Sequence, residues 1–310
     1  MDVKITVVTT LYYSEPYLTE FYNRTKIVLK QISKDSEIIF VNDGSPDGCV
    51  QKVLELQRQD SSIVLIDLSR NFGHHQAIMT GLQHVSGDYI FLIDADLEED
   101  PELLLTFFKT IQEDKTIDVV YGVQNKRKGN FTERITGSIF YKILNMLTKI
   151  NYPANTLTAR LMKRDYVTTV TKFEEKAIDI WAIFVLAGYN QKGVNAEKKN
   201  KGKSTYTFSK RLAMGVESIT SFSHRPLYFI FFIGSIWLII STINVLIILS
   251  KKWIFGVSIE GWSSIMASVW LIGGVTIFLI GLIGIYLSKM FLEIKSRPLS
   301  IIKTIYRKQE

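Results

Sequence analysis

Short apolar runs rich in β-branched and aromatic residues alternate with segments of helical periodicity over the first part of the chain. The apolar runs predict strands at Ile5–Thr10, Glu37–Asn42, Ile63–Leu68, Tyr89–Asp94 and Val119–Val123. The segments between them predict helices at Lys26–Ser33, Cys49–Gln59, His75–His84 and Pro101–Gln112. Because strands and helices alternate, the pattern predicts an α/β fold with a doubly wound, mostly parallel sheet.

Two long apolar stretches without charged residues follow, at 227–249 and 264–288. Each exceeds the roughly 20 residues that a helix needs to cross a hydrocarbon core. The pattern therefore predicts a two-helix transmembrane hairpin with an extracytoplasmic loop at 250–263. Basic residues gather on both flanks of the hairpin, so the positive-inside bias predicts that both flanks are cytoplasmic.

These features predict an order of segments along the chain. Residues 1–208 form a cytoplasmic catalytic domain, 209–226 an amphipathic juxtamembrane segment, and 289–310 a basic cytoplasmic tail after the hairpin. Residues 130–150 also place apolar side chains at helical spacing. That segment either packs on the core or lies at the membrane interface to admit a lipid.

Composition and charge narrow the class of protein. The 47% hydrophobic content averages a polar first part and an apolar end. The net charge of +7 reports topology and also suits anionic lipid headgroups or phosphorylated substrates. Cys49 is the only cysteine, which excludes an intramolecular disulfide and a Cys-rich zinc site. We interpret Cys49, His75 and His84 as structural residues.

Acidic residues follow two of the predicted strands, at the edge where parallel sheets bind ligands. Asp43 opens a Gly- and Pro-containing turn after the second strand, and turn chemistry alone could explain it. Asp94 and Asp96 alternate at the tip of the fourth strand, where they would repel each other without a cation or a substrate donor. Such oxygen ligands suit Mg²⁺ or Mn²⁺. An acidic helix start explains Glu99 and Asp100 better than it explains Asp94.

An ordered set of motifs runs along nearly the whole chain: Val41–Ser45, Ser69–His74, Gly81-Leu82, Gly87-Asp88, Asp94–Leu97, Arg160–Met162, Gly202–Tyr206 and the paired apolar stretches. With these motifs the chain resembles the family 2 glycosyltransferases, in the membrane-anchored branch of dolichyl-phosphate mannose synthase and bacterial polyprenyl-phosphate glycosyltransferases. The resemblance implies a GT-A fold and inverting, metal-dependent transfer of a sugar from a nucleotide-diphosphate sugar.

The resemblance also implies roles for particular residues. Asp43 lies near the nucleotide base, and Asp94 and Asp96 lie near the ribose and the metal. Asp96 is the principal ligand of Mg²⁺ or Mn²⁺, with Asp94 and Glu98 beside it. The implied donor-binding set is Thr10, Tyr12, Glu15, Asp43, Ser45, Arg70, Asn71, His74 and Asp94. Asp94, Asp96 and Arg160 form the implied catalytic set, and Arg160, Lys201, Lys203 and Ser204 the acceptor-phosphate set.

The chain departs from the family pattern on the donor side and in the mobile loop of the family. The usual opening Pro-x-Tyr-Asn-Glu is replaced by Thr10–Ser14, so its acidic contact is displaced to Glu15 or absent. Glu98 replaces an amide and brings more charge to the metal. Lys203 replaces the usual Glu of the Gly202–Tyr206 loop, which leaves a solvated Lys-rich loop as an alternative.

A further departure bears on the acceptor, because Thr158 occupies the position of an aspartate that could serve as a base. An ionised phosphate needs little help from a base, whereas a sugar hydroxyl usually needs deprotonation. The acceptor is therefore either a phosphate or a hydroxyl served by another carboxylate such as Asp179.

The leading hypothesis is transfer to a polyprenyl phosphate at the cytoplasmic face of a bacterial membrane by an integral, multi-pass protein. The alternative is extension of a lipid-linked saccharide in surface-polysaccharide assembly. A decayed, non-catalytic scaffold is a minor alternative. We expect membrane lipids as partners and no nucleic acid. Glycines in the second apolar stretch also permit a homo-oligomer.

Overall fold

The computed structural model describes residues 3–124, 155–175, 179–199 and 261–308, together with isolated positions between 232 and 243. Contacts divide the described residues into two units. The first unit contains the described residues up to 199 and those from Arg297 onward. The second unit contains the remaining described residues, which end at Ser296.

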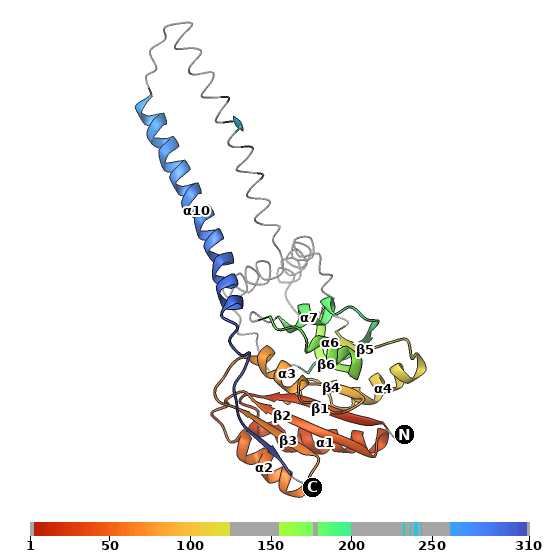
Figure 1. The fold of residues 1–310 in the computed structure, drawn as a ribbon. Helices are drawn as coiled ribbons and strands as arrows, with labels where there is room; N and C mark the ends of the chain where they lie inside the picture. Colours follow the sequence, from red (N-terminus) through yellow and green to blue (C-terminus); the bar gives the residue numbers. More distant parts are fainter. Residues whose placement is uncertain are drawn as a thin grey trace. The chain divides into compact units, whose positions relative to one another are not determined.

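The first unit alternates strands and helices from its beginning (Figure 1). Its elements are β1 (Lys4–Leu11), the short 3-10 helix η1 (Glu15–Tyr17), α1 (Leu18–Ile32), β2 (Asp35–Asn42), α2 (Cys49–Gln59), β3 (Ile63–Leu68), α3 (His74–Leu82), β4 (Tyr89–Leu92), α4 (Leu103–Glu113), β5 (Val119–Val123), β6 (Thr156–Lys163), α6 (Arg164–Val170), α7 (Ile180–Leu186), β7 (Gln191–Asn195) and β8 (Ile302–Arg307).

These strands form a single mixed sheet in the order β7-β5-β6-β4-β1-β2-β3-β8. The four neighbouring strands β3, β2, β1 and β4 are parallel to one another. Strand β6 lies antiparallel between β4 and β5, and β8 lies antiparallel to β3 at the other edge. The α/β prediction is confirmed, and the sheet is mixed, with β6 and β8 antiparallel to their neighbours.

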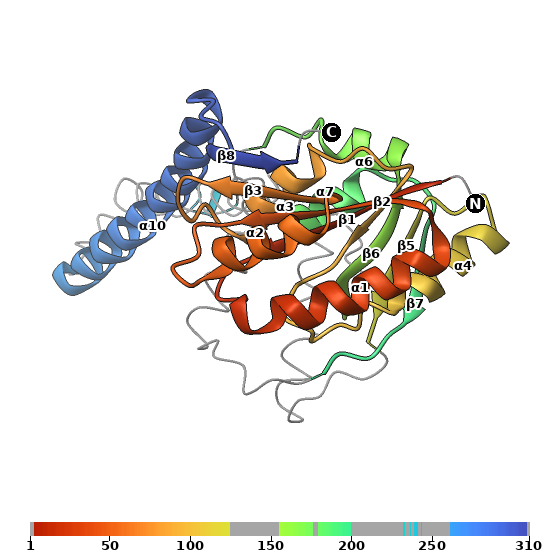
Figure 2. The ribbon, with the colours of Figure 1, turned by 90° about the horizontal axis from the view of Figure 1, so that it is seen from below.

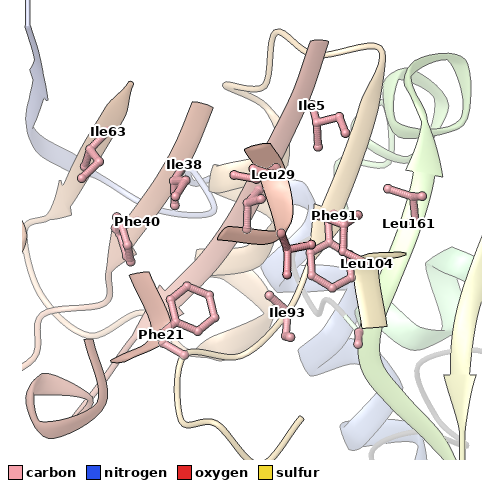
Figure 3. Close-up of a cluster of buried hydrophobic side chains, with 14 of the residues drawn as sticks. Ile5, Phe21, Leu29, Ile38, Phe40, Ile63, Phe91, Ile93, Leu104 and Leu161 are labelled. Carbon is pink, nitrogen blue, oxygen red and sulfur yellow. The ribbon is translucent and has the colours of Figure 1, made fainter. Parts of the chain in front are cut away.

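Alternating side chains explain why both faces of the sheet are covered. In β2, Ile38 and Phe40 belong to one apolar cluster, and Ile39 and Val41 belong to the other. Helices α1, α2 and α4 supply the first cluster, which Figure 3 shows around Phe21. Helices α3, α6 and α7 supply the second cluster. Figure 2 shows α1 and α2 side by side along the sheet. A period of two with both faces apolar is typical of a buried central strand.

The five predicted strands and four predicted helices of the first 123 residues are all present. Helix α2 and strands β3 and β5 have the predicted bounds, and the other elements have shifted ends. Helix α1 begins at Leu18 instead of Lys26, because Leu18 and Phe21 continue its buried face toward the N-terminus. Elements β6, β7, α6 and α7, the short η1 and the C-terminal β8 were not predicted.

Part of the predicted basic tail at 289–310 forms a strand that was not predicted. Ile302–Arg307 forms β8, and Ser69 N donates to Ile301 O at 2.9 Å beside it. Gln57 Nε2 donates to Tyr306 O at 2.9 Å. The sequence alternates inward and outward side chains there, and the open edge of β3 supplies the backbone partners.

The second unit contains α10 (Trp262–Ile294), which carries large exposed apolar side chains such as Ile265, Val269 and Ile280. Across the described residues, no helix satisfies the joint requirement of length and apolar character for a membrane span. The predicted hairpin is therefore not found in this part of the chain. Almost all of the predicted first span at 227–249 lies outside the described residues, as do the segments 130–150 and 209–226.

Candidate active site

The carboxyl ends of β1, β2 and β4 meet at one edge of the sheet, because β1 pairs in parallel with both other strands. Asp43 N donates to Leu11 O at 3.0 Å, so the residue after β2 lies against the end of β1. On the other side, Ile93 N donates to Val8 O at 3.1 Å and extends β4 toward Asp94. The acidic residues predicted after two separate strands therefore share this edge.

Asp43 connects the end of β2 to the loop that follows β3. Its side chain is 3% exposed and accepts from Phe72 N at 2.7 Å and from Gly73 N at 3.0 Å. Burial raises the pKa of Asp43, although both backbone donors oppose the rise. Gly44 has φ +60°, and a Cβ there would lie 2.4 Å from the carbonyl carbon of Arg70. Only glycine permits this close approach of the two loops.

The loop after Asp43 also binds the residues that follow β1. Tyr13 N donates to Ser45 Oγ at 2.8 Å, and Ser45 Oγ donates to Asp47 Oδ1 at 2.6 Å. Glu15 Oε2 accepts from Gly48 N at 2.8 Å, at the start of α2. Of the predicted donor-binding residues here, Ser45 and Glu15 fix the loop, while the Tyr12 residue is 50% exposed.

Arg70 and Asn71 lie on the exposed side of the loop that Asp43 binds. The Arg70 guanidinium lies 4.0 Å from the centre of the Phe72 ring, and Arg70 Nη1 donates to Asn71 O at 2.9 Å. Both contacts are local, and the Arg70 side chain is exposed beside Asp43, on which its charge acts.

His74, at the start of α3, connects β1 to Asp94. Its Nδ1 lies 3.1 Å from Thr10 Oγ1, and its Nε2 lies 3.6 Å from Asp94 Oδ1. The other Asp94 oxygen, Oδ2, accepts from Thr158 Oγ1 at 2.7 Å. The structure thus brings together the predicted residues Thr10, His74 and Asp94, and adds Thr158 from β6. Thr158, which stands where the family pattern would place a base, is therefore hydrogen-bonded directly to Asp94.

Asp96 and Glu98 follow Asp94 in a tight acidic loop. Asp96 Oδ1 accepts from Glu98 N at 2.9 Å, and Leu97 between them has φ +59°. Burial raises the pKa of Asp96, and the charges of Asp94 and Glu98 raise it further. Glu98 Oε2 pairs with Lys198 Nζ at 2.8 Å. The three predicted metal ligands are therefore close enough to act on one another electrostatically.

Glu99 is a site residue that the sequence reasoning assigned only to a helix start. It is 1% exposed, and its two oxygens accept from Thr158 N at 3.0 Å and from Ala159 N at 2.6 Å. Burial, followed by the charge of Asp94, raises the pKa of Glu99 to about 7. Glu99 thus fixes β6 so that the Thr158 hydroxyl reaches Asp94. The acidic run was the only signal in the sequence.

Arg160 is 3% exposed and packs on aromatic rings of α7. Its guanidinium carbon lies 3.8 Å from the Phe184 ring centre and 4.7 Å from that of Trp181. Burial lowers the pKa of Arg160 to about 10, so the side chain keeps its charge at neutral pH. The other predicted acceptor-side residues, Lys201, Lys203 and Ser204, lie outside the described residues.

The carboxylates of this loop fit a magnesium or manganese ion. In the ranges that the structure describes, no three His, Cys, Asp or Glu side chains form a preassembled metal group. Mg²⁺ is usually held by one or two carboxylates together with substrate phosphates, so a preassembled group is not required. Burial raises the pKa of Asp96 most, and repulsion from Asp94 and Glu98 raises it further. A cation among these carboxylates would relieve the repulsion.

Comparison with known proteins agrees with this geometry. Residues 6–171 match the model of glycosyl transferase family 2. A Mycobacterium tuberculosis protein named among the glycosyltransferases is 43% identical over 98% of this chain and 89% of its own length. The SfII prophage-derived bactoprenol glucosyl transferase of Shigella flexneri is 29% identical over 98% of this chain and 99% of its own length. The chain belongs to glycosyl transferase family 2 and is a glycosyltransferase.

Mannosyl-3-phosphoglycerate synthase from Rubrobacter xylanophilus matches with a TM-score of 0.49 and 13% identity, over 70% of this chain and 72% of that chain.

Proposed function

We propose that this glycosyltransferase moves a sugar from a nucleotide-diphosphate sugar to a polyprenyl phosphate, with inversion and with a divalent metal ion. The observation that carries the proposal is the convergence of Asp43, Asp94 and Asp96 at the carboxyl ends of β2 and β4, the two parallel strands that flank β1. In open α/β sheets this edge is the usual place for a nucleotide ligand.

On the donor side, we assign the nucleotide to the loops that Asp43 holds together. Its bonds to Phe72 N and Gly73 N fix the backbone between Arg70 and His74. Exposed Arg70 and Asn71 then offer donors to the nucleotide, and half-exposed Tyr12 offers an aromatic ring. Rigid support of this kind lowers the entropic cost of binding the donor.

Asp94, Asp96 and Glu98 are the proposed ligands of the metal ion. When bound, Mg²⁺ or Mn²⁺ would supply Lewis-acid stabilisation of the departing diphosphate. The protein's own contribution is orientation: Thr158 Oγ1 donates to Asp94 Oδ2, and His74 lies beside the other Asp94 oxygen. Glu99 in turn holds the backbone of Thr158.

On the acceptor side, two observations favour a phosphate over a sugar hydroxyl. No carboxylate occupies position 158, where a base is expected, and the Asp179 side chain accepts from Trp181 N at 3.1 Å as the N-cap of α7. A phosphate is already ionised and needs no such base. The name of the bactoprenol glucosyl transferase relative supports a polyprenyl lipid as the acceptor. We assign Lys201, Lys203 and Ser204 to the acceptor phosphate, with Arg160 adding charge from beneath the site.

We further propose that the reaction takes place at the cytoplasmic face of a membrane. Exposed apolar side chains along α10, including Ile265, Ile272 and Leu287, support this placement. Lys289, Lys295 and other basic residues follow the apolar stretch in the sequence, as the positive-inside bias requires of a cytoplasmic flank.

The test supplies two acceptors to the purified chain with Mn²⁺ and a panel of nucleotide sugars. One acceptor is a polyprenyl phosphate, and the other is a saccharide linked to the same lipid. We expect a glycosylated lipid phosphate from the first acceptor and no product from the second. Product from the lipid-linked saccharide alone would replace the proposed acceptor by the alternative, and no product from either would refute the proposed transfer.

A further inference from the structure

The acidic loop contains more negative charge than a divalent cation site requires. Asp94, Asp96, Glu98 and Glu99 lie within six residues, and Glu99 is fully enclosed. Like charges at such spacing destabilise one another unless a cation lies among them. The protein therefore needs a source of positive charge at this loop before any metal ion arrives.

Lys198 supplies positive charge to this loop. It follows β7, and its Nζ lies 2.8 Å from Glu98 Oε2 with the side chain 35% exposed. The charge of Lys198 also acts on Asp96 and Glu99, where it opposes the combined effects of burial and neighbouring carboxylates. A single ammonium group is thus in contact with one proposed metal ligand and within electrostatic reach of the others.

The backbone beside Lys198 is held independently of this contact. Lys199 N donates to Glu98 O at 2.7 Å, and Lys199 Nζ pairs with Asp100 Oδ1 at 2.6 Å. Arg24 of α1 pairs with the same Asp100 side chain. These bonds fix the segment on the acidic loop, so the long, flexible Lys198 side chain can leave Glu98 without moving the backbone.

We propose that Lys198 is an internal counter-ion that occupies the metal position in the empty enzyme and shifts to the donor diphosphate when the metal ion binds. This inference rests on the proposed metal-dependent transfer and deepens it. A metal ion arriving alone must displace the ammonium group from Glu98. A metal ion arriving with a diphosphate brings new negative charge, and Lys198 then has a new partner.

The consequence is coupling between metal and nucleotide binding. Lys198 weakens the binding of the metal alone and strengthens the binding of a metal diphosphate, so the two ligands favour each other. Because the Lys198 side chain is partly exposed and screened by solvent, we expect each effect to be on the order of tenfold, which corresponds to about 1.4 kcal/mol.

The first test measures Mn²⁺ binding to the purified full chain without nucleotide, by the electron paramagnetic resonance signal of free Mn²⁺. Lys198→Met should bind Mn²⁺ about tenfold more tightly than wild type, and Lys198→Arg should resemble wild type. Lys199→Met is the matched control. It removes the same charge at the next residue, where the partner is Asp100, which is not a proposed metal ligand. Its Mn²⁺ affinity should stay within about twofold of the wild-type value.

Two results would overturn the inference in this test. One is an unchanged or weaker Mn²⁺ affinity in Lys198→Met. The other is an equal gain in Lys199→Met, which would show a general effect of net charge instead of an occupied site.

The second test titrates UDP, and separately GDP, into the same proteins at saturating Mn²⁺, by calorimetry. Lys198→Met should bind the better of these nucleotides about tenfold more weakly than wild type. Equal affinities in Lys198→Met and wild type would refute the shift of Lys198 while leaving the proposed function intact. Wild-type protein that binds neither nucleotide with Mn²⁺ would contradict the proposed function, and the inference would fall with it.

Discussion

Glu99 should make the stability of this protein depend on pH in a direction opposite to most carboxylates. Its pKa is raised from 4.5 to about 7 in the folded chain, first by burial and then by the charge of Asp94. A raised carboxyl pKa means that the folded state holds the proton more tightly than the unfolded state. The stabilisation is complete below the unfolded value near 4.5 and is lost as pH rises through about 7.

The size of the effect follows from the shift. A difference of about 2.5 pH units at 1.36 kcal/mol per unit gives a loss of about 3 kcal/mol in the free energy of unfolding between pH 4.5 and pH 8. Glu99 is 1% exposed, so solvent screening does not reduce this figure substantially. Glu99→Gln mimics the protonated side chain at every pH, and the variant should lack this loss.

The assay is urea unfolding of the purified chain with EDTA, from pH 4.5 to pH 8, followed by tryptophan fluorescence. The stability of Glu99→Gln relative to wild type should improve by about 3 kcal/mol across this range. Glu102→Gln is the control, because that carboxylate pairs with Arg24 on the surface. A difference between Glu99→Gln and wild type that stays constant with pH would refute the reasoning.

Three further predictions concern the neighbouring residues. Gly44→Ala should lower the free energy of unfolding by about 2 kcal/mol or more, because the new Cβ meets the Arg70 backbone. Gly188→Ala, where φ is positive but the surrounding space is open, should lower it by about 1 kcal/mol; equal losses would contradict this. Thr158→Val should lower kcat about tenfold and Thr158→Ser should not, since only the hydroxyl contacts Asp94; equal kcat values would contradict it. Asp43→Asn should weaken nucleotide binding about tenfold in calorimetry, because the amide loses the charge and the Oδ2 acceptor of Gly73 N; unchanged binding would oppose this role.

The sequence was sufficient for the central strands of the fold because they are continuous apolar runs. Strands such as β2 and β3 are buried along nearly their whole length, and this pattern is visible without a structure. Strand β6 was missed because Arg160 stands at its centre, and a buried guanidinium interrupts the apolar run. Strand β8 was missed because its partner β3 lies more than 230 residues earlier in the chain.

The site was predictable only where its residues follow strand ends. The position after a strand drew attention to Asp43, Asp94 and Asp96, and the family resemblance supplied their expected roles. The bond from Thr158 to Asp94 joins residues 64 positions apart, and no local pattern reports it. The bonds of Glu99 to β6 could not be foreseen for the same reason.

The central claim is sugar transfer to a lipid phosphate that depends on Asp96 and a divalent ion. The most direct measurement counts labelled sugar that moves from the nucleotide donor into organic-extractable polyprenyl phosphate, with Mn²⁺ or with EDTA. Wild type and the surface control Glu113→Gln should form this lipid only with Mn²⁺, and Asp96→Asn should form at least about a hundredfold less, because it loses a charged ligand. Equal product from Asp96→Asn and wild type, or equal product with EDTA and with Mn²⁺, would contradict the account.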